Sequence, residues 1–133
     1  MIKQGYRGYC VHQPFNGLRV PVPLQNIVLR DFLNRKGLMF KLSVNELDFP
    51  NSHVQLFSLL DQLDVLEGLV MTSIFMLPSD AIIRQKIYRR IQDTHSIIYF
   101  VIENMALKDV DDAQKIEDLF SMTRLLPHCL KKI

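Results

Sequence analysis

The sequence is poor in cysteine, glycine and tryptophan: it has two cysteines, five glycines and no tryptophan in 133 residues. Cys10 and Cys129 lie near opposite ends and form no Cys-x-x-Cys pair, so we expect two reduced thiols, with neither a disulfide framework nor a metal site. No apolar run reaches the roughly 18 to 20 residues that cross a bilayer. The longest run, residues 68–77, has the length of a strand. These absences exclude a disulfide scaffold and a membrane span.

Neither sign of charge dominates, because 16 basic and 14 acidic residues leave a net charge of +2. This balance is too weak to attract nucleic acid by charge alone. The basic set Arg84, Lys86, Arg89 and Arg90 is typical of a solvated helix face, since only Tyr88 beside it could stack on a base. We therefore expect no nucleic-acid partner. The N-terminal segment lacks the apolar core of a signal peptide, which predicts a cytoplasmic protein.

Several common catalytic motifs are also missing. The chain has no G-x-G-x-x-G, no Walker loop, no Cys-x5-Arg phosphatase loop and no G-x-S-x-G elbow. Each of these motifs supplies the backbone cradle or nucleophile of a large enzyme class. Their absence disfavours the usual nucleotide enzymes, and we expect no cofactor.

What is present is a regular alternation of strand and helix periodicity. Strand patterns cover residues 5–11, 38–44, 69–77 and 96–104, and helical patterns cover 21–37, 52–68, 79–93 and 109–126, the last closed by Pro127. The later strands are almost continuously apolar, as strands buried on both faces are. Strict alternation predicts a parallel sheet with right-handed crossovers. We predict one α/β domain over residues 1–133, with a mostly parallel four-stranded sheet in the order 2-1-3-4, helices on both faces and a flavodoxin-like arrangement.

Polar side chains cluster where the predicted strands end. In an open parallel sheet, ligands bind beyond the carboxyl ends of the strands, where the strand order reverses, here between the first and third strands. The residues at these ends are His12, Gln13, Asn16 and Arg19 after the first strand, Ser43 and Glu46 after the second, Ser73 in the third and Glu103 after the fourth. We predict that they share one crevice.

The loop 12–22 leads into the start of a helix, where free backbone N–H groups favour an anion. Arg19 could add a charge-assisted contact, and Gln25, Asn26 and Arg30 follow on the helix. This arrangement predicts a phosphate or carboxylate site. The alternative is an ordinary turn with solvated arginines, one of them paired with Asp31.

His12 and Glu103 are the candidate general acid and base, because they are the titratable side chains nearest the expected crevice floor. A carboxylate at the end of an apolar strand is costly unless it is paired or used. For His12, a purely structural role is the alternative.

Several segments together resemble a known family. These are Gly5-Tyr6-Arg7-Gly8-Tyr9, then "PFNGLRVPVPLQNIVLRDF" over 14–32, Leu42-Ser43 with Glu46, "LEGLV" over 66–70, "SIFMLP" over 73–78, and Tyr88-Arg89-Arg90. Over about residues 5–105 the chain resembles the sporadic carbohydrate cluster proteins, which are encoded among bacterial genes for surface polysaccharides. Gln13 and Leu47 depart from the family pattern, where arginine and tyrosine stand. The resemblance implies a role in making or modifying a lipopolysaccharide or capsule sugar.

A second resemblance, in strand and helix order, is to the catalytic domain of serine recombinases. It implies a resolvase-like fold but not the activity. The position of the nucleophilic serine falls near His12, those of the Asp and first Arg fall on Phe75 and Met76, and that of the second Arg falls on Ser79. Of the recombinase positions, only the acidic residue after the fourth strand is matched here, by Glu103. Strand cleavage needs the nucleophile and the arginines, so recombination is rejected.

Together these patterns predict an enzyme or enzyme subunit that acts on an anionic sugar or sugar nucleotide. The alternative is a non-catalytic binding or assembly module for a glycan enzyme. An exposed sheet edge and an apolar surface on the last helix, formed by Leu119, Phe120, Leu125 and Leu126, predict a homo-oligomer.

Overall fold

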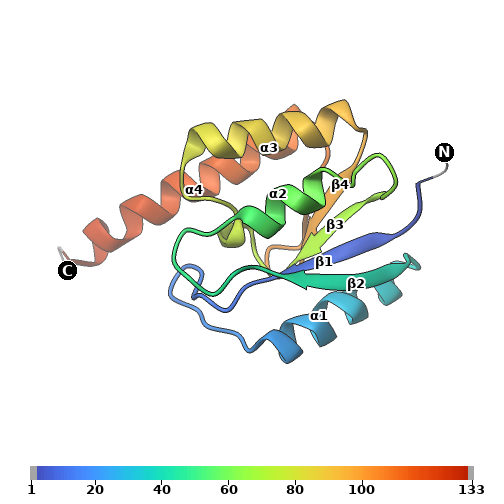
Figure 1. The fold of residues 1–133 in the computed structure, drawn as a ribbon. Helices are drawn as coiled ribbons and strands as arrows, with labels where there is room; N and C mark the ends of the chain where they lie inside the picture. The colour runs from blue at the N-terminus through green and yellow to red at the C-terminus, as the bar shows by residue number, and fades with distance from the viewer. Residues whose placement is uncertain (1–2, 132–133) are drawn as a thin grey trace.

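The computed structural model describes residues 3–131, and for 124–131 it describes the backbone alone. The elements are β1 Tyr6–Cys10, α1 Val22–Arg35, β2 Phe40–Asn45, α2 Val54–Leu60, β3 Gly68–Met71, the 3-10 helix η1 Ile74–Met76, α3 Ala81–Asp93, β4 Ile97–Phe100, β5 Met105–Leu107 and α4 Val110–Lys131. Figure 1 shows α1 on one face of the sheet and α2, α3 and the first half of α4 on the other. The predicted α/β domain with helices on both faces is confirmed.

The sheet has the order β2-β1-β3-β4-β5. The first four strands are parallel and follow the predicted order 2-1-3-4. β5 is an addition: it pairs with β4 in the antiparallel direction. The strand predicted over 96–104 ends at Phe100, because residues 101–104 form a turn that Asn104 closes with a φ of 52°. Asparagine tolerates this left-handed conformation, so the chain reverses there.

The strand predicted over 69–77 is also shorter. β3 ends at Met71, and η1 follows. Ser73 Oγ accepts a hydrogen bond from Phe75 N, and Glu103 accepts one from Ile74 N at 2.9 Å. These side-chain caps take the amides that a longer strand would have used in the ladder. The carboxyl end of β3 therefore becomes a tight turn beside the strand ends of β1 and β2.

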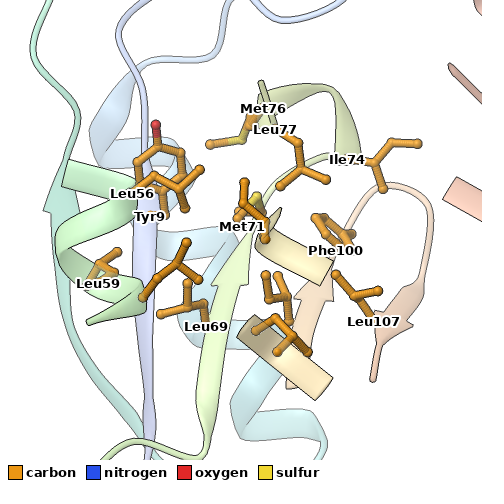
Figure 2. Close-up of a cluster of buried hydrophobic side chains, with 14 of the residues drawn as sticks. Tyr9, Leu56, Leu59, Leu69, Met71, Ile74, Met76, Leu77, Phe100 and Leu107 are labelled. Carbon is orange, nitrogen blue, oxygen red and sulfur yellow. The ribbon is translucent and has the colours of Figure 1, made fainter. Parts of the chain in front are cut away.

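Two apolar cores hold the layers together. The larger core lies between the sheet and α2, α3 and α4, and Figure 2 shows Leu59, Leu69, Met71 and Phe100 within it. The smaller core packs Leu29 and Leu33 of α1 against Tyr6 and Val70. Each fully buried side chain of this kind contributes about 1.5–3 kcal/mol. The apolar positions of β1, β3 and β4 thus pack against the helix layers, whereas Leu42 of the edge strand β2 is exposed.

The helix α4 continues to Lys131 and passes Pro127, so the predicted stop at Pro127 is wrong. Leu119 and Phe120 are half-buried against the larger core rather than forming a free surface. The side chains of Leu125 and Leu126 lie outside the described part of the chain. Self-association therefore stays a prediction. Across residues 3–131, no helix has the length and apolar character needed to span a bilayer.

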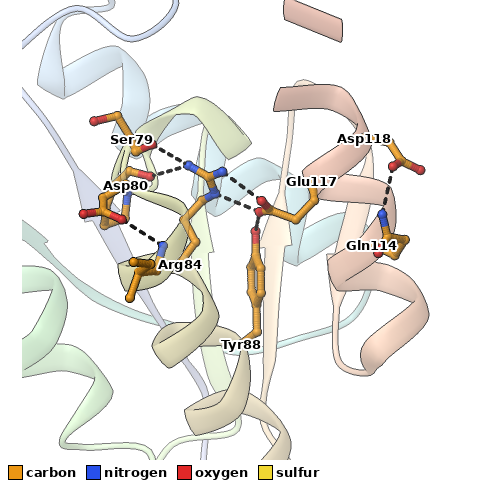
Figure 3. A network of polar contacts seen from close by, with 9 residues as sticks. Ser79, Asp80, Arg84, Tyr88, Gln114, Glu117 and Asp118 are labelled. Carbon is orange, nitrogen blue, oxygen red and sulfur yellow. Dashed lines mark hydrogen bonds and ion pairs between the residues drawn. The ribbon is translucent and has the colours of Figure 1, made fainter. Parts of the chain in front are cut away.

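Arg84 is the principal buried charge, and it contradicts the predicted solvated face of α3. It is 1% exposed, and its guanidinium binds Glu117 of α4 through Nε at 2.7 Å and Nη2 at 2.8 Å. Its Nη1 donates to the carbonyls of Pro78 and Ser79, and the ring of Phe120 lies 3.9 Å from the guanidinium carbon. Tyr88 also donates to Glu117 (Figure 3). This network ties α4 to α3 and to the turn after η1.

We expect Arg84→Ala to lower the free energy of unfolding by about 3–5 kcal/mol, because the Glu117 carboxylate loses its buried cationic partner and two carbonyls lose their donor. Urea unfolding at neutral pH measures the loss. The matched control is Lys86→Ala, an exposed change on the same helix, which should stay within about 0.5 kcal/mol of the parent. Equal stability of the two variants would contradict the role of the network.

Candidate functional site

A pocket of about 210 Å³ lies beyond the carboxyl ends of β1, β2 and β3, where the predicted crevice was placed. Its polar lining consists of His12, Gln13, Asn16, Glu46, Asn51, Ser52, His53 and Ser79. Its apolar lining includes Phe15, Leu47, Phe49, Phe75 and Leu77. Of the predicted site residues, the structure brings His12, Gln13, Asn16 and Glu46 together here.

The loop after β1 is held in place by a tight turn. Asn16 and Gly17 have φ values of 52° and 77°, and Phe15 and Leu18 exchange both backbone hydrogen bonds, at 2.9 and 3.0 Å. Two left-handed residues in a row are the geometry of a two-residue hairpin, for which Asn-Gly is the preferred pair. The Phe15 ring is 4% exposed and anchors this hairpin in the core. The loop therefore presents its polar side chains from a fixed backbone.

Gln13 links this loop to the one after β2. Its side-chain amide donates to Asp48 Oδ1 at 2.8 Å. His12, one residue earlier, is exposed at the pocket edge. The two loops therefore form opposite walls of the same pocket.

Glu46 is the buried carboxylate of the pocket. It accepts hydrogen bonds from Tyr9 Oη at 3.0 Å, Ser52 Oγ at 2.9 Å, Leu47 N at 2.9 Å and the Leu56 and Gln55 amides at the start of α2. Burial alone would raise the pKa of Glu46, but these donated hydrogen bonds outweigh it and hold the pKa below its usual value. The carboxylate is therefore ionised and committed to capping α2.

His53 is a pocket residue that the sequence analysis missed. It directly precedes α2, and its Nδ1 is buried without a hydrogen-bond partner among the described residues. Burial lowers the pKa of His53, although the nearby Glu46 carboxylate opposes this effect. Its only signal in the sequence is its place in the first turn of the helix predicted over 52–68. An unpaired buried nitrogen beside a pocket is a ready contact for a ligand.

Glu103 and Ser73 meet each other but do not line the pocket. Ser73 Oγ donates to Glu103 Oε2 at 2.7 Å, and Ile74 N donates to Oε1. The carboxylate thus supports η1, whose Phe75 and Met76 form part of the pocket wall. The structure places Glu103 behind that wall, away from His12.

Gln25 acts as a clamp on the loop between β1 and α1. Its side chain is fully buried, accepts from Val11 N at 3.2 Å, and donates to the carbonyls of Val11 and Val20 at 2.7 Å each. These bonds join the two ends of the loop that carries His12 and Arg19. Gln25 therefore supports the loop from beneath and does not face the pocket.

The other predicted anion-binding residues are dispersed. Asn26 accepts a hydrogen bond from Ser43, and both lie beside the buried Cys10 thiol. Arg19 is exposed and does not line the pocket, and Arg30 lines a different groove at β2. The structure does not bring Arg19 and Arg30 to one anion site at the start of α1.

Within the described residues, no three His, Cys, Asp or Glu side chains lie close enough together to bind a metal ion. Burial raises the pKa of the Cys10 thiol to about 11, so the thiol is protonated and unreactive at neutral pH. The side chains of His128 and Cys129 lie outside the described part.

Comparison with known proteins gives a structural likeness without a sequence match. The fold is similar to the N-terminal catalytic domain of TP901-1 integrase, with a TM-score of 0.59 over 93% of this chain and 98% of that domain. The two sequences are 8% identical, so the likeness shows the resolvase-like fold alone. The sequence matches no protein-family profile and no curated protein. The resemblance to serine recombinases is thus confirmed at the level of the fold.

We expect Glu46→Gln to destabilise the protein by about 1–3 kcal/mol, because the amide cannot accept from all the donors that face the carboxylate. The pH dependence gives a second readout. Because the folded-state pKa of Glu46 lies below the ordinary value of 4.5, its contribution is complete above pH 4.5 and is lost as pH falls through the folded-state pKa.

Urea unfolding of the parent and of Glu46→Gln between neutral and acidic pH measures both effects. The stability difference between the two proteins should shrink as the pH falls below 4.5. A difference that stays constant across this range would show that ionised Glu46 does not cap α2.

Proposed function

We propose that this chain binds or acts on an anionic sugar or sugar-nucleotide intermediate in the cytoplasm, in the synthesis of a bacterial surface polysaccharide. The link to polysaccharide synthesis comes from the resemblance of residues 5–105 to the sporadic carbohydrate cluster proteins. The observation that carries the ligand class is the pocket itself, which combines side-chain amides and histidines with partly exposed aromatic rings.

The chemistry of a sugar ring fits this lining. Its hydroxyls need donors and acceptors, which Gln13, Asn16 and Ser79 supply, and its C–H faces pack on rings such as Phe49 and Phe75. The volume of about 210 Å³ is below the range of about 300–1,000 Å³ for drug-sized ligands. A single sugar unit therefore matches the pocket, and the rest of a sugar nucleotide would lie outside it.

The anionic preference depends on His12 and His53, since none of the described lysines and arginines lines the pocket. A protonated imidazole donates from both nitrogens and forms a charge-assisted contact with a phosphate or carboxylate. These two histidines are also the groups available for proton transfer to a bound sugar, because Glu46 and Glu103 are held by other partners.

A non-catalytic binding or assembly module is the second candidate function. The carboxylates of Glu46 and Glu103 favour this candidate, because both accept hydrogen bonds from the first amides of a helix and are therefore not available to a ligand in the pocket. Incubation with sugar phosphates and nucleotide sugars, followed by mass spectrometry, separates the candidates. Conversion of a ligand that stabilises the protein indicates an enzyme, and stabilisation without conversion indicates a module.

We expect a sugar phosphate or nucleotide sugar at ten times its Kd to stabilise the protein by about 1.4 kcal/mol. For a chain of this size the shift in Tm is several degrees. His12→Ala and Phe49→Ala should weaken binding, because they remove a donor and a packing surface from the pocket. Arg19→Ala is the matched loop control and should leave the Kd unchanged. If Arg19→Ala weakens binding while His12→Ala does not, the ligand lies at the start of α1 instead.

Binding of a nucleotide sugar should tighten as the pH is lowered through the pKa of His53, which burial holds below 6.5. The pyrophosphate keeps its charge over this range, so the change reports on the protein. Calorimetric titration of the parent and of His53→Gln from neutral to mildly acidic pH measures the effect. The Kd of the variant should depend less on pH than that of the parent. Identical pH dependence would show that His53 does not contact the ligand.

A further inference from the structure

A second groove lies along the outer edge of β2, away from the pocket at the strand ends. We propose that it docks an extended segment of a partner polypeptide that carries both acidic and apolar side chains. The groove has a volume of about 810 Å³. This proposal is independent of the sugar ligand and rests on different residues.

The groove lies along the edge of β2 that pairs with no other strand in the described part of the chain. β2 is the terminal strand of the sheet in the described part of the chain, so its outer backbone groups have no neighbouring strand. Arg30 of α1 borders the groove on one side of the sheet, and Gln62 and Val65, which follow α2, border it on the other. An edge strand flanked by both helix layers is a common place for an extended peptide to add to a sheet.

The charge of the groove has one sign. Its lining contains three cationic side chains, Arg7, Arg30 and Lys41, and no carboxylate. Arg7 is positioned by hydrogen bonds to the Leu42 carbonyl at 3.0 Å and to Gln62 Oε1 at 3.0 Å, and Arg30 lies over the Phe40 ring. Within the described residues, none of the three forms a salt bridge. Their charges are therefore available to acidic side chains of a partner.

The same groove exposes apolar surface beside these charges. Leu42 is 78% exposed and Met39 is 55% exposed, and both line the groove. Large apolar side chains on a sheet edge are unfavourable in water and are usually covered. Cations on both sides of the edge, beside apolar side chains, match a partner segment that carries carboxylates and aliphatic groups on both of its faces.

A second copy of this chain is a poor occupant. Pairing two β2 edges across a two-fold axis would bring Arg7 and Lys41 of one copy next to the same cations of the other, which is repulsive. An extra residue in β2 also shifts its register against β1 between Arg7 and Tyr9. Such a bulge twists the edge and disfavours long sheet-to-sheet pairing. A short acidic peptide avoids both costs.

The test titrates the full chain into a fluorescent peptide of about eight residues in which pairs of glutamates alternate with pairs of valines, so that each face of the strand carries both, and follows the anisotropy. We expect saturable binding that Arg30→Glu with Lys41→Glu weakens by at least about tenfold. The matched control is Lys86→Glu with Arg89→Glu, the same change in net charge at two exposed positions on α3. It should leave the Kd unchanged, as should His12→Ala.

Backbone pairing has its own readout. Methylation of alternate peptide nitrogens should abolish binding, and bound peptide should slow hydrogen exchange of the β2 amides. Three results would overturn the proposal: no binding at about 1 mM peptide, equal loss in the groove and control variants, or equal affinity of the methylated peptide. Light scattering that shows a dimer broken by the groove variant would identify a second copy as the occupant and would also overturn it.

Discussion

The need to satisfy the carboxylates of buried Glu46 and half-buried Glu103 at the ends of parallel strands organises the end of the molecule that holds the pocket. Glu46 follows β2, and Glu103 lies in the turn after β4, where ionised groups are costly unless several donors surround them. Each carboxylate reaches the first amides of a helix, α2 for Glu46 and η1 for Glu103. These contacts define where the two helices begin: η1 forms part of the pocket wall, and Ser52 and His53, directly before α2, also line the pocket.

This use of the carboxylates determines which chemistry is left for a ligand. With both committed to backbone amides, the pocket keeps two histidines, side-chain amides and aromatic rings. Glu46, the one carboxylate among the described lining residues, is held by its contacts with Ser52 and the start of α2. The similarity to the catalytic domain of an integrase, at 8% identity, shows the fold alone and does not decide the chemistry.

The two edges of the sheet are treated differently. Beyond β4, the chain folds back as β5 and covers that edge with an antiparallel strand. At the other edge, β2 is bulged and bordered by cations and exposed apolar side chains. The bulge limits indiscriminate pairing, while the groove keeps a short, chemically distinct stretch of edge available. The pocket and this groove are therefore separate surfaces. The pocket lies at the carboxyl end of β2, and the groove lies along its outer edge.

By itself, the sequence determined the α/β class, because apolar periodicity and turn residues act over short distances along the chain, and the order of the four parallel strands, because strictly alternating strands and helices restrict the topology. Only the tertiary structure decided the fifth strand, the burial of Arg84 and the roles of Gln25, Glu46 and Glu103 as structural clamps. It also separated Arg19 and Arg30 from His12 and added His53 to the pocket. Hydrogen bonds such as that from Arg84 to Glu117 join residues 33 positions apart, and local patterns carry no record of which distant partner a polar side chain will meet.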